Sequence, residues 1–188
     1  MKQFAIRALI LGLVAAGATP AMAQNLIANP TFDTDYSGWP AGGAEWVADD
    51  CCGNPASGSI RVVQFDRLWS NCMSVTAGNA YDLTFWTKYV GVLNLVNPNG
   101  FALVVWMNTP TCEPVFDLSP YHGVPPGNDA AWHHVGATFI APAGAQSVAI
   151  VLGGNICGIT CGGYTSFDDV AFGPAGTVPV ELQSFEID

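Results

Sequence analysis

Positive charge is the scarcest feature of this sequence. Its 188 residues include five Lys and Arg against fifteen Asp and Glu, for a net charge of −10. Beyond residue 23 only Arg61, Arg67 and Lys88 are positive, against all fifteen acidic residues, so that part carries −12. A phosphate backbone or an anionic membrane surface needs several Lys or Arg to bind. We therefore exclude nucleic acid and membrane surfaces as partners, whereas neutral ligands and divalent cations are compatible with this charge.

Long apolar runs are also lacking, apart from one near the N-terminus. Phe4 to Gly17 is mostly apolar, Lys2 and Arg7 precede or interrupt it, and Ala21-Met22-Ala23 has the small-residue pattern that signal peptidase cleaves. The run is shorter than the roughly 20 apolar residues of a membrane span. We expect residues 1–23 to be a signal peptide and the rest to be secreted or displayed at the cell surface, without membrane insertion.

A helical repeat of apolar residues is the third absence, because no window after residue 23 keeps a 3.6-residue period. Short β-rich runs separated by turn residues occur instead. Half of the residues are hydrophobic and 11% are aromatic, unlike a disordered chain. The pattern predicts a single all-β domain, an antiparallel β-sandwich or jelly roll. The clearest expected strands cover residues 60–65, 81–90, 101–108, 132–140, 147–152 and 164–172.

Alternation within these runs assigns side chains to two faces. In the 81–90 run, the apolar side of Leu83 and Phe85 is opposed by a mixed side that carries Trp86. In the 101–108 run, the side of Phe101 is opposed by one that carries Trp106. We expect the sides with the isolated tryptophans to face away from the core. A purely solvated face would not need tryptophan.

The six cysteines all follow residue 23. An even number in an exported chain favours disulfides, for which fifteen pairings are possible. The Cys157–Cys161 spacing is near that of zinc ligands, but no second compact Cys/His pair accompanies it. We interpret Cys157 and Cys161 as a local disulfide. Cys72 and Cys112 would then each form a disulfide with one of the adjacent Cys51 and Cys52.

Four motifs follow one another along the chain. They are Asn25 to Asp33 with Ser37-Gly38-Trp39, Val75 to Lys88, Trp132 to Phe139, and Phe167 to Phe172. In this order they resemble the carbohydrate-binding modules attached to bacterial cellulases and xylanases. The resemblance covers about residues 25 to 173 and implies a galactose-binding-like jelly roll that binds a polysaccharide or glycan. It supports the fold more strongly than the activity, because one fold hosts many functions.

The resemblance also implies a structural calcium ion where the first and last strands lie side by side. The matching ligands are Asp33, the Thr31 carbonyl, Asp168 and, from the loop before the second long strand, Asp50. Carboxylate and carbonyl oxygens are the ligands that Ca²⁺ prefers. Alternation sends Asp168 and Asp169 to opposite faces, and we expect Asp168 to face the ion. The alternative is that these carboxylates are solvated or cap turns.

The tryptophans on the mixed strand sides predict a sugar platform. The C–H face of a sugar ring packs on an aromatic ring, and its hydroxyls need amide, carboxylate or imidazole partners. The alternative for each tryptophan is packing inside the sandwich. The predicted ligand-binding residues are Trp86 and Trp106, with Trp69 and Tyr121 at the rim and Asn108 and His134 as polar partners.

Catalytic patterns do not stand out. The sequence has no Gly-x-Ser-x-Gly elbow and no acidic pair in a hydrolase motif. We therefore expect no enzyme, but a secreted module that binds a neutral glycan. The alternative is a structural or adhesive extracellular protein that uses the sandwich for contacts with a protein partner.

The expected module covers residues 24–173, and residues 174–188 form a tail. Val178 to Asp188 resembles the Pro-Val-Glu-Leu-x-Ser-Phe tails of some exported bacterial proteins, which together with the signal peptide indicates a bacterial source. The tail is interpreted either as a secretion or surface tag or as an extra edge strand, in which Pro179 and the acidic residues discourage further pairing.

Overall fold

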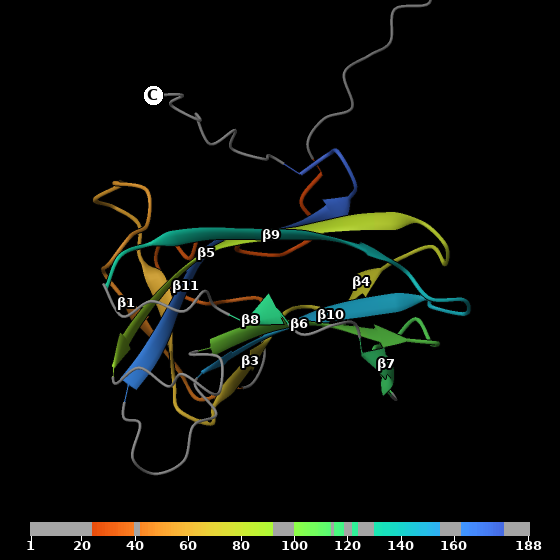
Figure 1. Cartoon of the computed structure of the whole chain (residues 1–188), viewed down its shortest axis with the longest axis horizontal. Coiled ribbons are helices and arrows are strands. Elements are labelled where there is room, and N and C mark those ends of the chain that lie inside the picture. Colours follow the sequence, from red (N-terminus) through yellow and green to blue (C-terminus); the bar gives the residue numbers. More distant parts are fainter. Residues whose placement is uncertain are drawn as a thin grey trace, which may run out of the picture.

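The computed structural model describes residues 24–39, 42–91, 100–113, 115–118, 122–123, 130–154 and 163–178. This part of the chain forms eleven strands and no helix, and all strand pairs are antiparallel. The strands make two sheets that face each other (Figure 1), which confirms the predicted β-sandwich. The expected signal peptide and residues 179–188 of the expected tail lie outside the described residues.

The first sheet has five strands and the second has six. The first is ordered β1 (Ala44–Val47), β2 (Ser59–Val63), β11 (Gly163–Pro174), β5 (Ala80–Gly91) and β9 (His133–Ile140). The second is ordered β3 (Arg67–Trp69), β10 (Ser147–Gly154), β6 (Gly100–Met107) and β7 (Val115–Leu118), with β4 (Met73–Ser74) paired to β10 and β8 (His122–Gly123) paired to β6. All six strands expected from the sequence are present.

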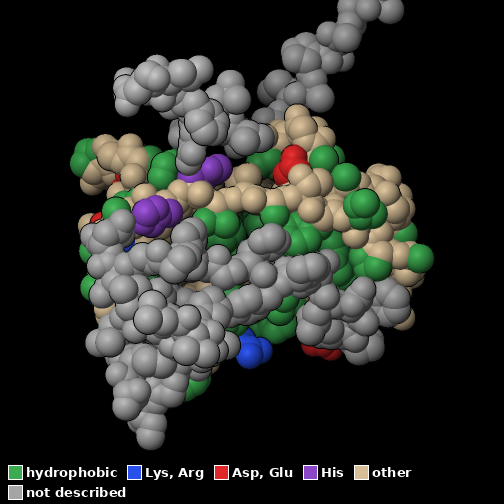
Figure 2. Space-filling view, in the orientation of Figure 1, with side chains coloured by type: hydrophobic (Ala, Val, Ile, Leu, Met, Phe, Trp, Pro, Cys, Tyr) green, Lys and Arg blue, Asp and Glu red, His purple; other side chains and the backbone are tan. Residues whose placement is uncertain are grey.

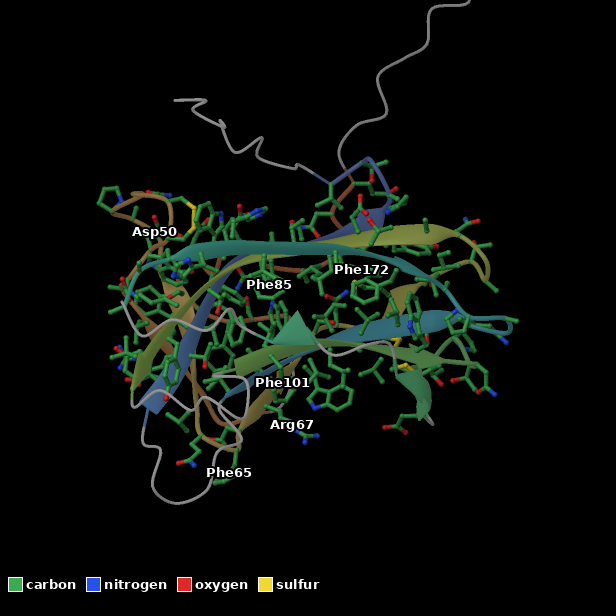
Figure 3. All side chains as sticks on the ribbon, in the orientation of Figure 1. Asp50, Phe65, Arg67, Phe85, Phe101 and Phe172 are labelled. Carbon is green, nitrogen blue, oxygen red and sulfur yellow. A yellow bond between two sulfur atoms is a disulfide. The ribbon has the colours of Figure 1, made fainter. Side chains whose placement is uncertain are left out.

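The core between the sheets follows from period-two alternation. On β5, the inward side chains of Leu83 and Phe85 are each 1% exposed, and on β11 Phe172 is fully buried. Phe85 and Phe172 point into the space between the sheets (Figure 3). Trp39 closes the same core at 2% exposure, and its indole N–H donates to the carbonyl of Ala28 at 3.0 Å.

Strand β6 reverses the predicted assignment of its faces. Trp106 is fully buried and lies against Tyr81 and Phe172, with ring centroids 6.3 and 6.4 Å away, so it belongs to the core and not to an outer platform. The side of Phe101 and Val105 faces outward, yet it is also buried, in a second apolar cluster. The prediction was wrong because a strand that is apolar on both sides gives alternation nothing to distinguish.

The segment before β1 runs along β11, as the resemblance implied. The amide of Leu26 donates to the Phe172 carbonyl at 2.8 Å, and the amide of Val170 donates to the Pro30 carbonyl at 2.9 Å. In the same part of β11, the pairing with β5 shifts register between Asp168 and Ala171. Asp169 sits at this irregularity with a φ of 44°, a left-handed conformation that the local bulge imposes. The bulge brings both aspartates to the mouth of an acidic pocket.

Candidate functional site

The outer face of the five-stranded sheet combines aromatic and polar side chains. Alternation on β5 sends Asp82, Thr84, Trp86 and Lys88 outward, opposite the buried core residues. Trp86 is the register partner of His134 on β9, and their ring centroids are 5.2 Å apart. Figure 2 shows histidine side chains at the surface over one end of β9. The sheet register therefore places an indole beside an imidazole. Both residues were predicted from the sequence for the ligand-binding face, but not as neighbours.

A shallow groove of about 290 Å³ adjoins this aromatic pair. The hydroxyl of Thr138 donates a hydrogen bond to the Asp82 carboxylate at 2.6 Å, which fixes the position of the carboxylate in the groove. Gly136 lies opposite Thr84, and the missing side chain leaves the strand surface open there. The groove is lined by Asp82, Thr84, His134, Gly136, Ala137 and Thr138. It thus offers a carboxylate, hydroxyls and an imidazole next to an aromatic ring.

The same face holds four buried polar atoms that have no hydrogen-bond partner in the described part of the chain. They are the hydroxyls of Ser59 and Ser166, the Nε of Arg61 and the indole Nε1 of Trp86. Native proteins pair nearly all such atoms, and an unpaired one costs free energy. All four lie on the outward sides of β2, β11 and β5, so the fold concentrates its unmet hydrogen-bonding capacity on this face.

Two cations of this face are already engaged. Lys88 forms an ion pair with Asp49 from the β1–β2 loop, and its ammonium lies 4.6 Å from the centre of the Trp132 ring. Arg61 is 3.6 Å from Glu45 and lies over the ring of Tyr164 at 4.0 Å. The positive charge here is neutralised by neighbours, which leaves the face suited to a neutral ligand.

The remaining predicted platform residues are dispersed. Trp69 packs against the apolar cluster on the outer face of the other sheet. Asn108 is exposed just after β6, and its carbonyl accepts a hydrogen bond from Gln146 at 2.7 Å. Tyr121 lies outside the described residues. Among the predicted residues that the structure describes, only Trp86 and His134 lie together. The groove residues Asp82 and Thr84 were not singled out from the sequence, although alternation already placed them on the side of Trp86.

A second concave site gathers the residues predicted to hold calcium. A pocket of about 190 Å³ is lined by Thr31, Asp33, Asp50 and Asp168, together with Cys51, Cys52, Asn54, Ser57 and Asp169. The hydroxyl of Ser57 donates to the Thr31 carbonyl and to the Asp33 carboxylate, both at 3.0 Å. The Asp50 carboxylate accepts the amides of Cys52 and Asn54 at 2.8 and 2.7 Å, which fixes the loop that forms one wall.

Asp168 is the most perturbed acid of this pocket. It is 1% exposed, and burial raises its pKa to about 7, with the nearby charges of Asp50 and Asp169 acting in the same direction. The amides of Cys51 and Asp169 donate to its two oxygens at 3.0 and 2.8 Å and partly oppose the increase in pKa. A buried carboxyl group that faces other carboxylates is stabilised either by a proton or by a cation.

Oxygen atoms dominate the donor set of this pocket, which matches the preference of calcium. In the ranges that the structure describes, no three His, Cys, Asp or Glu side chains are grouped so as to hold a metal ion by themselves. The Thr31 carbonyl and the Ser57 hydroxyl lie among the carboxylates and supply further oxygens. The pocket therefore fits a cation that accepts carbonyl and hydroxyl ligands, and calcium binding stays a prediction.

The disulfides correct the predicted pairing. Cys51 is bonded to its neighbour Cys52, and Cys72 is bonded to Cys112 across 40 residues of sequence. Cys157 and Cys161 lie outside the described residues. The prediction was wrong because the β1–β2 loop holds Cys51 and Cys52 over the acidic pocket, whereas Cys72 precedes β4 and Cys112 follows β6, two strands that both pair with β10.

Solved structures with the same architecture include two carbohydrate-binding modules and a phage protein. A family 16 carbohydrate-binding module aligns with a TM-score of 0.56 and 13% identity over 79% of this chain and 99% of its own. The CBM22-2 xylan-binding domain of Paenibacillus barcinonensis Xyn10C aligns with a TM-score of 0.53 and 13% identity over 77% and 97%. The enzymatically active domain of bacteriophage CBA120 tailspike protein 4 reaches 0.61 with 16% identity over 80% of this chain.

These similarities show that the chain has the β-sandwich fold of carbohydrate-binding modules. The chain spans 21% of the solved chain of the tailspike domain. No protein-family model and no curated protein sequence matches the chain. Within the described residues, no helix has the length and apolar character to cross a membrane.

Proposed function

We propose that this protein is a secreted, non-catalytic module that binds a neutral glycan on the outer face of its five-stranded sheet. The observation that carries the proposal is the Trp86–His134 pair beside the Asp82–Thr138 groove. An indole packs on the C–H face of a pyranose, while the carboxylate and the imidazole pair with its hydroxyls. The fold shared with carbohydrate-binding modules supports the same conclusion.

The charge of the protein and the groups in the groove favour a neutral sugar as ligand. The net charge of −10 and the Asp82 carboxylate in the groove repel anionic ligands. The hydroxyls of Thr84 and Thr138 and the imidazole of His134 line the same groove. These groups can donate and accept hydrogen bonds to the hydroxyls of a neutral sugar.

Binding without chemistry is the second part of the proposal. The Asp82 carboxylate is held by Thr138 and by the Gly176 amide at 2.8 Å, which suits a fixed hydrogen-bond acceptor. Asp168, the acid with the raised pKa, lies in the separate acidic pocket beside the β1–β2 loop. The two acids are therefore built into different sites, one for sugar hydroxyls and one for a cation.

The acidic pocket is proposed to hold a structural calcium ion. Asp33, Asp50, Asp168 and the Thr31 carbonyl would be its ligands. These residues come from the N-terminal segment, the β1–β2 loop and β11, so a bound cation joins three parts of the chain that are distant in sequence. The negative charge that raises the pKa of Asp168 would be compensated by the ion.

The decisive experiment measures glycan binding by isothermal titration calorimetry, after a glycan array has supplied the ligand. Trp86→Ala should weaken binding at least tenfold while near-ultraviolet circular dichroism shows an intact fold. Trp69→Ala is the matched control, because this tryptophan is also half-buried but lies on the other sheet. Loss of binding in Trp69→Ala alone would move the site to the six-stranded sheet. Absence of any glycan ligand would favour the structural or adhesive alternative.

A further inference from the structure

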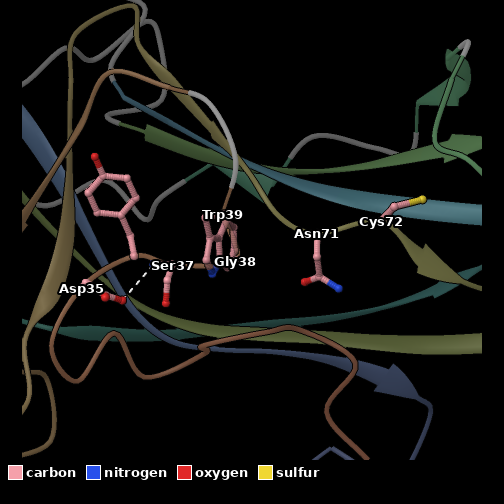
Figure 4. A pocket seen from close by; sticks show the side chains of 7 residues that line it. Asp35, Ser37, Gly38, Trp39, Asn71 and Cys72 are labelled. Carbon is pink, nitrogen blue, oxygen red and sulfur yellow. Dashed lines mark hydrogen bonds between the residues drawn. The ribbon is translucent and has the colours of Figure 1, made fainter.

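A concave site formed in part by the N-terminal segment is separate from both the sheet groove and the acidic pocket. It has a volume of about 670 Å³ and is lined by Asp35, Tyr36, Ser37, Gly38, Trp39, Asn71 and Cys72. Figure 4 shows Asp35 and Ser37 on one side of Trp39 and Asn71 on the other. Small-molecule sites commonly occupy 300–1,000 Å³ and combine an apolar lining with a few polar groups. This pocket has both properties.

The wall formed by residues 35–39 is fixed by its own hydrogen bonds. The Asp35 carboxylate accepts the amide of Ser37 at 2.9 Å and the side-chain amide of Asn29 at 3.2 Å. The amide of Trp39 closes the turn on the Tyr36 carbonyl at 3.1 Å. Gly38 has a φ of 86°, and an added Cβ would come within 2.9 Å of the Ala28 side chain. The turn is therefore preorganised before any ligand arrives.

This rigid turn presents an aromatic ring to solvent. Tyr36 is 38% exposed, whereas Trp39 of the same turn is 2% exposed and donates its indole N–H to the Ala28 carbonyl. The opposite wall carries Asn71, whose carbonyl oxygen accepts the Ala28 amide at 2.9 Å and whose side-chain N–H group makes only a long contact of 3.4 Å to the Leu26 carbonyl. The pocket thus has an exposed ring, an amide donor and a carboxylate acceptor.

The charge in the pocket selects the class of ligand. Hydrogen bonds from Ser37 hold the pKa of Asp35 below its usual range, so the carboxylate stays ionised and repels anions. The described residues that line the pocket include no Lys or Arg. A ring face for stacking with hydroxyl-pairing groups on both sides fits a neutral pyranose. We propose that this pocket is a second saccharide site, separate from the sheet groove, with Tyr36 as its stacking residue.

The choice of a sugar as ligand rests on the proposed function, but the two sites share no lining residue and are tested separately. The protein is labelled with ¹⁵N and titrated with glucose, galactose, mannose, xylose and xylohexaose. We expect at least one probe to shift the amides of residues 35–38 and the side-chain amide of Asn71. Tyr36→Ala should weaken this response at least tenfold, while Tyr36→Phe should retain it. Neither change should affect shifts at the Trp86 indole.

Phe65→Ala is the matched control, because Phe65 is 61% exposed on the β2–β3 turn and does not line the pocket (Figure 3). Shifts at Asn71 that persist in Tyr36→Ala, or that disappear equally in Phe65→Ala, would overturn the second site. Shifts confined to the Trp86 indole would do the same and leave the proposed function intact. Shifts confined to the Tyr36 pocket would support the second site and reject the sheet groove. No response to any probe would reject both.

Discussion

The outer faces of the two sheets differ in chemistry although the same kind of alternating strand builds them. The five-stranded sheet turns outward Trp86, His134 and the polar groove, with four unpaired polar atoms. The six-stranded sheet turns outward the buried apolar side chains of Phe101, Val105, Met107, Ala149 and Val151, with Trp69 at their edge. The first face is polar and carries a groove, whereas the second behaves as an additional core.

This difference shows when strand alternation places a tryptophan at the surface and when it does not. Trp86 lies on a strand whose two sides differ in polarity, so its exposure follows from its position. Trp106 lies on a strand that is apolar on both sides, and it fills the space between the sheets. The same residue type therefore lies at the surface in one strand and fills the core in the other.

Replacing the two tryptophans should separate these roles most strongly. Trp106→Ala removes a fully buried indole from the core and should lower the free energy of unfolding by about 3–5 kcal/mol. Trp86→Ala removes a half-buried ring, so its loss of unfolding free energy should be less than about half of that for Trp106→Ala. Urea unfolding followed by far-ultraviolet circular dichroism measures both. Equal losses would contradict the division between core and surface tryptophan.

The buried Asp168 should make stability depend on pH when calcium is chelated. Its pKa is about 7 in the folded protein against an ordinary value of 3.8, so the unfolded chain releases a proton that the folded chain retains. The free energy of unfolding should fall as pH rises from 4 to 7, by at most about 4 kcal/mol, and level off above 7. Asp168→Asn should abolish this slope, and the exposed Asp169→Asn should keep it. Denaturant titrations across this pH range provide the measurement.

Removal of calcium from the acidic pocket should also lower the stability of the protein. If the ion binds only the folded protein, a concentration of 100 times its dissociation constant adds about 2.7 kcal/mol to stability. Chelation should lower the melting temperature at pH 7.5, and calcium but not magnesium should restore it. Asp33→Asn should reduce the response to calcium. A melting temperature that is insensitive to both chelator and calcium would leave the acidic pocket without a metal.

Two glycines compare the packing of the two outer faces directly. A Cβ on Gly153 would lie 2.1 Å from the Phe101 ring, so Gly153→Ala should displace that ring and cost about 1–3 kcal/mol. The nearest atom to a Cβ on Gly136 would be a methyl carbon of Thr84, at 3.1 Å, so Gly136→Ala should change stability by less than about 1 kcal/mol. Because it partly fills the groove, the second change should weaken glycan binding.

The smallest effect is expected at the edge of the polar face. Glu45 is 65% exposed in its ion pair with Arg61, so Glu45→Gln should alter stability by less than about 0.5 kcal/mol. Unfolding at low and high salt should show the same small difference. A larger loss would indicate that Arg61 depends on this partner to remain buried on the sheet.

The six long strands were predictable because each contains enough residues to display a period of two. The short β3, β4 and β8 have two or three residues, and no alternation can be recognised over that length. The acidic pocket was predictable because motif resemblance aligned Asp33 and Asp168 from opposite ends of the domain, and the structure gathers both with Thr31 and Asp50. The Tyr36 pocket was not predicted, since its two walls come from turns without a repeating pattern.

The sequence by itself determined the all-β character, the strong negative charge and the outward position of Trp86, because composition and local alternation are properties of neighbouring residues. Only the tertiary structure decided which side of β6 faces the core, which cysteines pair and which residues share a pocket. These outcomes depend on contacts between residues far apart in the chain. The physical reason is that burial of an apolar side is equally favourable on either face until the second sheet occupies one of them.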